Sequence, residues 1–222
     1  KHIPAYLSEV SKHLTAQQDE TIERLDAIIK NVKQVKDIVE MQQSYTGINK
    51  HQDCVMLNEL IENAIEINSA GLQRQSVEVI REYDDIGNIL IDRQRCLQTL
   101  VNLIDNAEYS LSRSDREPKI LKIRTAKNNG SKLRIEVCDN GIGIPPTELN
   151  SIFDRGYTTK QTGHGFGLHS AALAAKEMGG NLTVRGEGLG RGATFVLTLP
   201  LRPGTITPAA ENPPDPGAEK SG

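Results

Sequence analysis

Two asparagines, Asn102 and Asn106, lie four residues apart in a segment that is otherwise mainly apolar. In a helix this spacing places both amides on one face, one turn apart. Because Leu100, Leu103 and Ile104 make the segment suited to burial, each amide would need a partner there. Mg²⁺ takes few protein ligands and would satisfy a buried amide oxygen. The pattern leaves two interpretations, a solvated helix face and a metal-binding face.

A carboxylate, Asp139, ends an alternating apolar segment and is followed by Gly141 and Gly143. Glycine permits positive φ and lets a flat ligand approach the backbone closely. In this position a carboxylate can accept a hydrogen bond from the exocyclic amine of adenine, and it rejects guanine, whose keto oxygen has no donor. An ordinary strand-to-turn junction uses the same residues, so the motif taken alone favours a simple turn.

Three glycines alternate at Gly163, Gly165 and Gly167, directly before a segment with helical character. Free backbone amides at a helix N-terminus attract phosphate. Lys160 follows two threonines just upstream and would add positive charge against the same group. Alternating glycines alone are weak evidence for a phosphate site, so this prediction depends on the lysine and the helix beside them.

Helical and strand patterns alternate from residue 55 to residue 202, and they predict the scaffold for these groups. Asp92 is the expected N-cap of the central helix, and Gly179 with Gly180 the expected end of the last one. Helices gathered on one face of a mixed sheet make an α+β fold, a two-layer α/β sandwich. The predicted helices cover 55–68, 93–112 and 169–179, and the predicted strands cover 76–83, 88–91, 119–128, 131–139, 181–187 and 193–200.

The N-terminal region carries apolar residues at steps of three, four and seven between residues 5 and 46, which predicts a long amphipathic helix. One helix cannot bury so broad a stripe, so a second copy of the chain or a neighbouring helix must cover it. Residues 203–222 are rich in proline and poor in large apolar side chains, and we expect a flexible tail there.

Four blocks, taken in their order, resemble the N, G1, F and G2 boxes of the histidine-kinase ATP-binding domain, in the superfamily that also holds gyrase, Hsp90 and MutL: VNLIDNA at 101–107, DNGIGI at 139–144, TTK at 158–160 and GHGFGLH at 163–169. The resemblance implies that Asn106 binds Mg²⁺, that Asp139 selects the adenine of ATP, and that 145–166 is a mobile lid. A further match, GRGATF at 190–195, implies that Thr194 lies beside Asp139 and helps hold a bridging water. The implied ATP-binding residues are Asn102, Asn106, Asp139, Gly141, Gly143, Lys160, Gly163, His164, Gly165, Gly167, Leu168 and Thr194.

Asn102 stands where hydrolytic relatives such as gyrase carry a Glu that orients the attacking water, and an amide cannot act as a general base. The asparagine at this position, together with the long N-terminal helix, makes the chain resemble the sensor histidine kinases of bacterial two-component systems. The resemblance implies a homodimer that moves the γ-phosphoryl group of ATP to a His and then to an Asp of a response-regulator receiver domain. Since none of His2, His13 and His51 has the acidic and Pro neighbours of the family's phosphoacceptor, we expect that His upstream of Lys1.

The expected organisation has three parts: residues 1–50 as the second helix of a dimerisation and phosphotransfer hairpin, 51–202 as the catalytic ATP-binding domain, and 203–222 as the tail. Tyr109 departs from the family, many of whose members have Lys or Arg near the phosphates, and Lys160 is expected to compensate. Two alternatives stay open, a gyrase- or Hsp90-like ATPase and a non-catalytic dimerisation or docking module with the same fold.

Composition limits the other partners. A formal net charge of −3 over 222 residues, with both signs interspersed, disfavours nucleic acid and anionic membranes. Cys54, Cys96 and Cys138 lie far apart, which argues against a zinc site and a disulfide framework. No apolar run approaches the roughly 20 residues of a membrane span. We therefore expect a cytoplasmic chain without membrane contact, any attachment of the full-length protein lying in another part.

Overall fold

The computed structural model describes residues 52–128, 131–160 and 165–204. The helix predicted at 5–46 and nearly all of the predicted tail lie outside the described residues, so both stay predictions. Residues 151–170 belong to a compact unit distinct from that of the sheet, and each unit is described on its own. None of the helices in the described part of the chain combines the length and the hydrophobicity that a membrane span requires.

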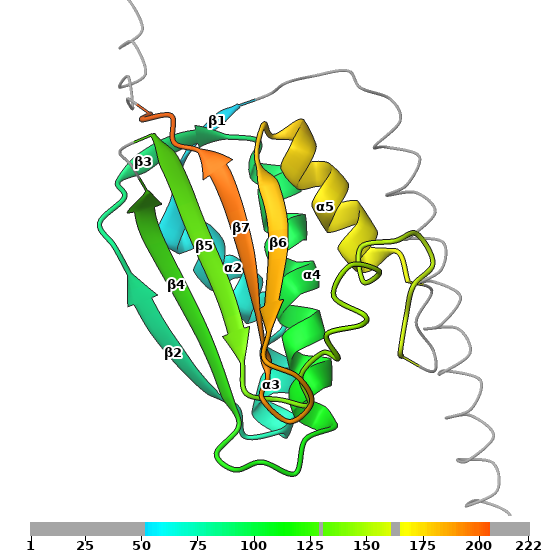
Figure 1. The fold of residues 1–222 in the computed structure, drawn as a ribbon. Helices are drawn as coiled ribbons and strands as arrows, with labels where there is room; N and C mark the ends of the chain where they lie inside the picture. The colour runs from blue at the N-terminus through cyan, green and yellow to red at the C-terminus, as the bar shows by residue number, and fades with distance from the viewer. Residues whose placement is uncertain (1–51, 129–130, 161–164, 205–222) are drawn as a thin grey trace, which may run out of the picture. The chain divides into compact units, whose positions relative to one another are not determined.

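Five strands form the main sheet, in the order β2-β4-β5-β7-β6 (Figure 1). β2 runs parallel to β4, and every other neighbouring pair is antiparallel. Along β5, buried Leu133, Ile135 and Val137 alternate with more exposed residues, so the sheet has one apolar face. The strands are β2 (Glu78–Tyr83), β4 (Ile120–Asn128), β5 (Lys132–Asp139), β6 (Asn181–Gly186) and β7 (Ala193–Pro200).

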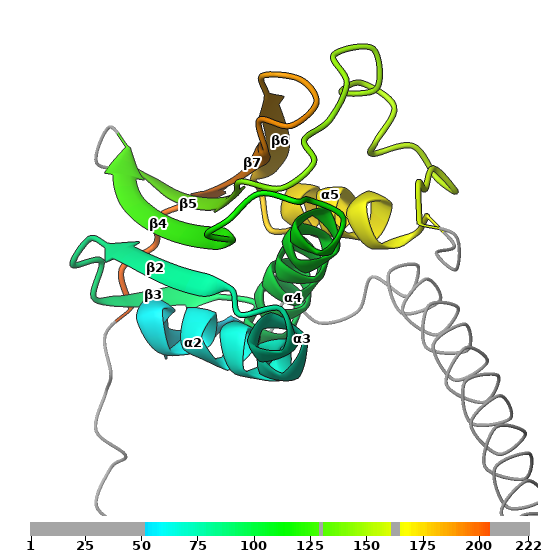
Figure 2. The same ribbon diagram turned by 90° about the horizontal axis from the view of Figure 1, so that it is seen from below.

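Helices cover the apolar face of this sheet and complete a second layer (Figure 2). They are α2 (Leu57–Ile67), α3 (Ser69–Arg74), α4 (Arg93–Ser112) and α5 (Gly167–Glu177), the last of which joins the sheet's unit from Ala171 onward. The two-layer α+β fold predicted from the sequence is thereby confirmed. Its core side chains include Leu57, Leu60, Ile61, Leu100, Leu103, Ile104, Leu111, Leu121, Ile123, Leu133, Ile135 and Leu197.

The ends of α4 and α5 follow the predicted capping residues. Asp92 Oδ1 accepts a hydrogen bond from the Arg95 backbone amide at 3.0 Å, as an N-cap does. At the C-terminal end of α5, the amide of Gly180 donates to Ala175 O at 2.8 Å, and Gly179 has a φ of +80°. These are features of a Schellman motif, which requires the left-handed conformation that glycine adopts freely.

Some predicted boundaries are wrong. The helix expected at 55–68 begins at Leu57, because Asp53–Met56 forms strand β1, which pairs antiparallel with β3 (Asn88–Ile91) in a separate small sheet. Helix α3 was not expected. It is six residues long and its one buried residue is Leu72, so it has too little periodicity to be visible in the sequence.

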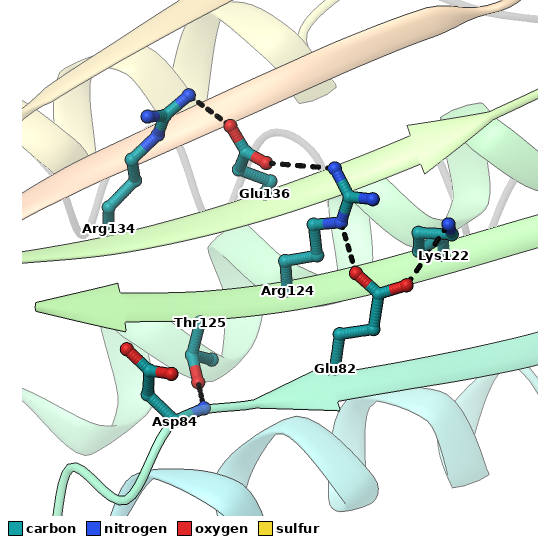
Figure 3. A network of polar contacts seen from close by, with 7 residues as sticks. All are labelled: Glu82, Asp84, Lys122, Arg124, Thr125, Arg134 and Glu136. Atoms are coloured by element: carbon teal, nitrogen blue, oxygen red, sulfur yellow. Dashed lines mark hydrogen bonds and ion pairs between the residues drawn. The ribbon is translucent and has the colours of Figure 1, made fainter.

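The face of the sheet away from the helices carries charged side chains that pair across the strands (Figure 3). Arg124 on β4 lies opposite Glu82 on β2 and Glu136 on β5, and it forms ion pairs with both. Lys122 pairs with Glu82 at 3.1 Å, and Arg134 pairs with Glu136. These partly exposed pairs keep this face hydrated and contribute little stability each.

Candidate functional site

Asp139 is the last residue of β5 and lies between β4 and β7 in the sheet. Its side chain is only 8% exposed. One oxygen, Oδ1, accepts two hydrogen bonds, from Ser110 Oγ at 2.7 Å and from the Gly141 backbone amide at 2.9 Å. The structure therefore holds a buried carboxylate in a fixed orientation at the end of a strand.

Burial raises the pKa of Asp139 above its ordinary value. The hydrogen bonds from Ser110 and from backbone amides, including that of Gly141, act in the opposite direction because they favour the charged form. A buried carboxylate without a charged partner is costly unless other donors compensate. A ligand that brings an N–H group to this carboxylate would supply such a donor.

The turn after Asp139 packs directly against the last part of α4. A Cβ added to Gly141 would lie 2.5 Å from the Ser110 carbonyl carbon and 2.6 Å from its oxygen, which is too close for any side chain. The Ile142 amide donates to Ser110 O at 3.2 Å and fastens the turn to the helix. Gly143 has a φ of +72°, and a Cβ there would meet the backbone of Gly188. Glycine at 141 and 143 is thus required by close packing of backbone.

The predicted Asn102 and Asn106 lie half-buried on α4, beside its apolar stripe. Gln98 Nε2 donates to Asn102 Oδ1 at 3.4 Å. Ser110 follows Asn106 by a further four residues, so the three side chains form one row along the helix. The row ends at Asp139, to which Ser110 is hydrogen-bonded. The fold therefore brings the amides of α4 and the carboxylate of β5 to the same region.

Thr194 was expected beside Asp139, and this placement is wrong. In the β5–β7 register Asp139 lies opposite Ala193, whereas Thr194 lies opposite Cys138. Successive side chains point to opposite faces of a strand, so Thr194 faces away from Asp139. Burial raises the pKa of the neighbouring Cys138 thiol, and the Thr194 side chain acts on that pKa in the opposite direction.

Residues 151–170 form the second part of the predicted site and belong to the other compact unit. The Gly156 amide donates to Gly165 O at 3.1 Å, and Gly165 has a φ of +70°. This hydrogen bond holds the backbone of Gly156 beside that of Gly165. His169 Nδ1 lies 3.0 Å from Phe153 O, and this contact further links the loop to the first turn of α5.

The predicted phosphate-binding residues lie partly in this loop. The Lys160 amide donates to Thr158 Oγ1 at 3.0 Å, which forms a local turn. Gly167 and Leu168 are the first two residues of α5. Gly163 and His164 lie outside the described residues, so their assignment to the site stays a prediction.

Ser110 is a site residue that the sequence-based reasoning missed. The signal was present, since Ser110 continues the four-residue spacing of Asn102 and Asn106. Serine is common at helix ends for local reasons, however, and only the packing of α4 against the turn after β5 shows which carboxylate it meets.

A hollow of about 520 Å³ lies elsewhere, at the opposite end of β4 and β5 from Asp139. Its lining includes Arg124, Arg134, Glu82 and Glu136, the paired side chains of Figure 3. Because these charges compensate one another, this hollow offers no clear excess of either sign to an ionic ligand.

Comparisons with known proteins identify the family to which the chain belongs. Residues 91–203 match the family described as histidine kinase-, DNA gyrase B-, and HSP90-like ATPase. The chain is 30% identical over 184 residues to the signal transduction histidine-protein kinase AtoS of Escherichia coli strain K12. That similarity covers 82% of this chain and 29% of AtoS, so the chain spans less than a third of that relative's length.

Solved structures show the same fold. Full-length ShkA in complex with AMPPNP superposes with a TM-score of 0.68 at 25% identity, covering 77% of this chain and 36% of ShkA. The histidine kinase ThkA in complex with the response regulator TrrA superposes with a TM-score of 0.62 at 23% identity, covering 79% of this chain and 50% of the matched chain.

Proposed function

Because the chain belongs to the histidine kinase-, DNA gyrase B-, and HSP90-like ATPase family, as an ATP-binding domain of the sensor histidine kinase type, we propose that the full-length protein is a two-component kinase. It would work as a homodimer, phosphorylate a His and pass the phosphoryl group to a response-regulator Asp. The observation that most supports adenine recognition is the buried Asp139 carboxylate, which Ser110 and Gly141 hold through a single oxygen.

The residues fit ATP in two respects. Asp139 provides an acceptor for the adenine amine, and the close backbone packing at Gly141 and Gly143 fixes the turn that directly follows this carboxylate. Asn106 is the proposed Mg²⁺ ligand, and the metal, when bound, neutralises phosphate charge. The residues proposed to surround the phosphates are Asn102, Lys160, Gly163, His164, Gly165, Gly167 and Leu168.

The proposed reaction joins a neutral imidazole nitrogen to the γ-phosphorus while the bond from that phosphorus to the bridging oxygen breaks, and ADP leaves with the electron pair. Such transfers depend mainly on positioning and on electrostatic stabilisation. Asn102 suits this reaction better than hydrolysis, since its amide cannot deprotonate water.

The reaction class is tested with full-length protein and ATP labelled in the γ-phosphate. We expect acid-labile label on a His of the protein, and its transfer to a receiver domain added afterwards. The chain of 222 residues alone is expected to bind ATP without labelling itself. Steady phosphate release from full-length protein that stays unlabelled would instead indicate a gyrase-like ATPase and would refute the kinase proposal.

Replacement of Asn106 by Ala is expected to remove the effect of Mg²⁺ on ATP affinity. In the unmodified chain, chelation of Mg²⁺ should weaken ATP binding about tenfold or more, because the triphosphate charge is then left without its metal. In the Asn106→Ala chain, affinity with and without chelator should be nearly equal. Gln94→Ala, at an exposed position in the first turn of the same helix, is the matched control and should keep the dependence. An unchanged Mg²⁺ effect in Asn106→Ala would rule out this metal ligand.

A further inference from the structure

The carboxylate of Asp139 is held by one hydroxyl and by backbone amides. Its Oδ1 accepts hydrogen bonds from Ser110 Oγ at 2.7 Å and from the Gly141 amide at 2.9 Å. The amide of Ala193, on the neighbouring strand β7, also favours the charged form of this carboxylate. The Ser110 hydroxyl therefore fixes Asp139 from the side of helix α4, while backbone amides act from the turn after β5 and from β7.

We infer that Ser110 is a positioning residue that keeps Asp139 an acceptor of hydrogen bonds only, and so sets the preference of this site for 6-aminopurines over 6-oxopurines. The inference rests on the proposed nucleotide site. It assigns the discrimination between these two classes of purine to a pair of residues, the Asp139 carboxylate and the Ser110 hydroxyl that fixes it. Asp139 alone would be insufficient.

The chemistry follows from the two forms of a carboxyl group. The ionised form only accepts hydrogen bonds and therefore suits the amine of adenine. The protonated form carries an O–H group, which can donate to the keto oxygen of hypoxanthine or guanine. Burial favours the protonated form of Asp139, and the Ser110 hydroxyl counters it by donating to the charged form. Without Ser110, both the orientation and the acceptor character of Asp139 would weaken.

A purely structural role for the Ser110 side chain fits the contacts less well. The turn after β5 is already fastened to α4 by the backbone bond from the Ile142 amide to Ser110 O, at 3.2 Å. The backbone of Gly141 also packs directly on the backbone of Ser110. Both contacts are retained when Ser110 is replaced by Ala, so this substitution should remove the bond to Asp139 while the turn stays in place.

The test compares affinities for Mg-ADP and Mg-IDP by calorimetry in the unmodified chain and in Ser110→Ala. We expect the ratio of ADP to IDP affinity to fall about tenfold or more, since one hydrogen bond to a charged group has an effect of at least this size. Ser110→Thr keeps a hydroxyl and should restore the ratio. Ser112→Ala, which removes an exposed hydroxyl bonded to Tyr109 O at 2.8 Å, should leave it unchanged.

The outcomes separate this inference from the proposed function. An unmodified chain that binds neither nucleotide would refute the nucleotide site itself. An unmodified chain that prefers ADP, together with a Ser110→Ala chain of equal selectivity and equal melting temperature, would overturn the role of Ser110 and leave the site intact. A parallel loss of ADP and IDP affinity, without a change in their ratio, would also overturn it.

Discussion

Replacement of Asp139 by Asn is expected to lower ADP affinity about a hundredfold or more, since the adenine amine would then meet an amide N–H₂ group where an acceptor stood. One hydrogen bond to a charged group contributes about 1.5–3 kcal/mol, and a mismatched buried donor adds to this loss. The amide retains one oxygen, which can still accept the bonds from Ser110 and Gly141. The change therefore removes recognition without removing the local contacts.

The same substitution is expected to leave the free energy of unfolding unchanged or raise it at neutral pH. The folded chain holds the pKa of Asp139 above its ordinary value, mainly through burial. A group whose pKa is higher in the folded state binds its proton more tightly there, so its contribution to stability is lost as pH rises through the folded-state pKa. The uncharged Asn avoids this loss. Its advantage over Asp139 should shrink as the pH falls and Asp139 becomes protonated.

Calorimetric titration with Mg-ADP and Mg-GDP, and thermal unfolding at neutral and mildly acidic pH, measure the two effects. The unmodified chain should bind ADP in preference to GDP. Asp85→Asn, at an exposed Asp in the loop before β3, is the matched control and should behave like the unmodified chain. If Asp139→Asn bound ADP as tightly as the unmodified chain, adenine recognition would have to lie elsewhere.

Much of the scaffold could be predicted because local signals and tertiary packing agree. The helix 93–112 was predicted with the bounds of α4, since a capping Asp92 precedes a regular apolar stripe. Strand β1 could not be predicted, because Asp53–Met56 is stabilised as a strand by pairing with Asn88–Ile91, more than thirty residues along the chain. Local preference is overridden where the partner is distant in sequence.

The site shows the same division. Asp139, Gly141 and Gly143 could be selected as candidates from the sequence because they lie within five consecutive residues, and their role in nucleotide binding stays a prediction. Ser110 and Thr194 were misjudged because their roles depend on which strands and helices meet. A shift of one position in the β5–β7 register exchanges the faces of Ala193 and Thr194, and the sequence of neither strand fixes that register by itself. The contacts of a residue with a different helix or strand are therefore what the structure reveals and the sequence does not.

Replacement of Gly141 by Ala is expected to damage both stability and nucleotide binding, because this glycine is the point where the turn after β5 touches α4. The new Cβ would fall on the hydroxyl and backbone of Ser110. The turn must then move away, and overpacking of this kind costs about 1–3 kcal/mol. Its movement would break the Gly141 bond to Asp139 and displace the carboxylate, so we expect ADP affinity to fall at least about tenfold.

Gly186→Ala is the matched control for this steric argument. Gly186 ends β6, and a Cβ there would lie 3.5 Å from Ile144 O and from Leu149 Cδ2, which is ordinary van der Waals contact. We expect this variant to bind ADP and to melt like the unmodified chain. Equal melting temperatures and ADP affinities for Gly141→Ala and Gly186→Ala would contradict the close approach of the turn to α4. A loss confined to Gly141→Ala would establish that contact as the support on which the position of Asp139 depends.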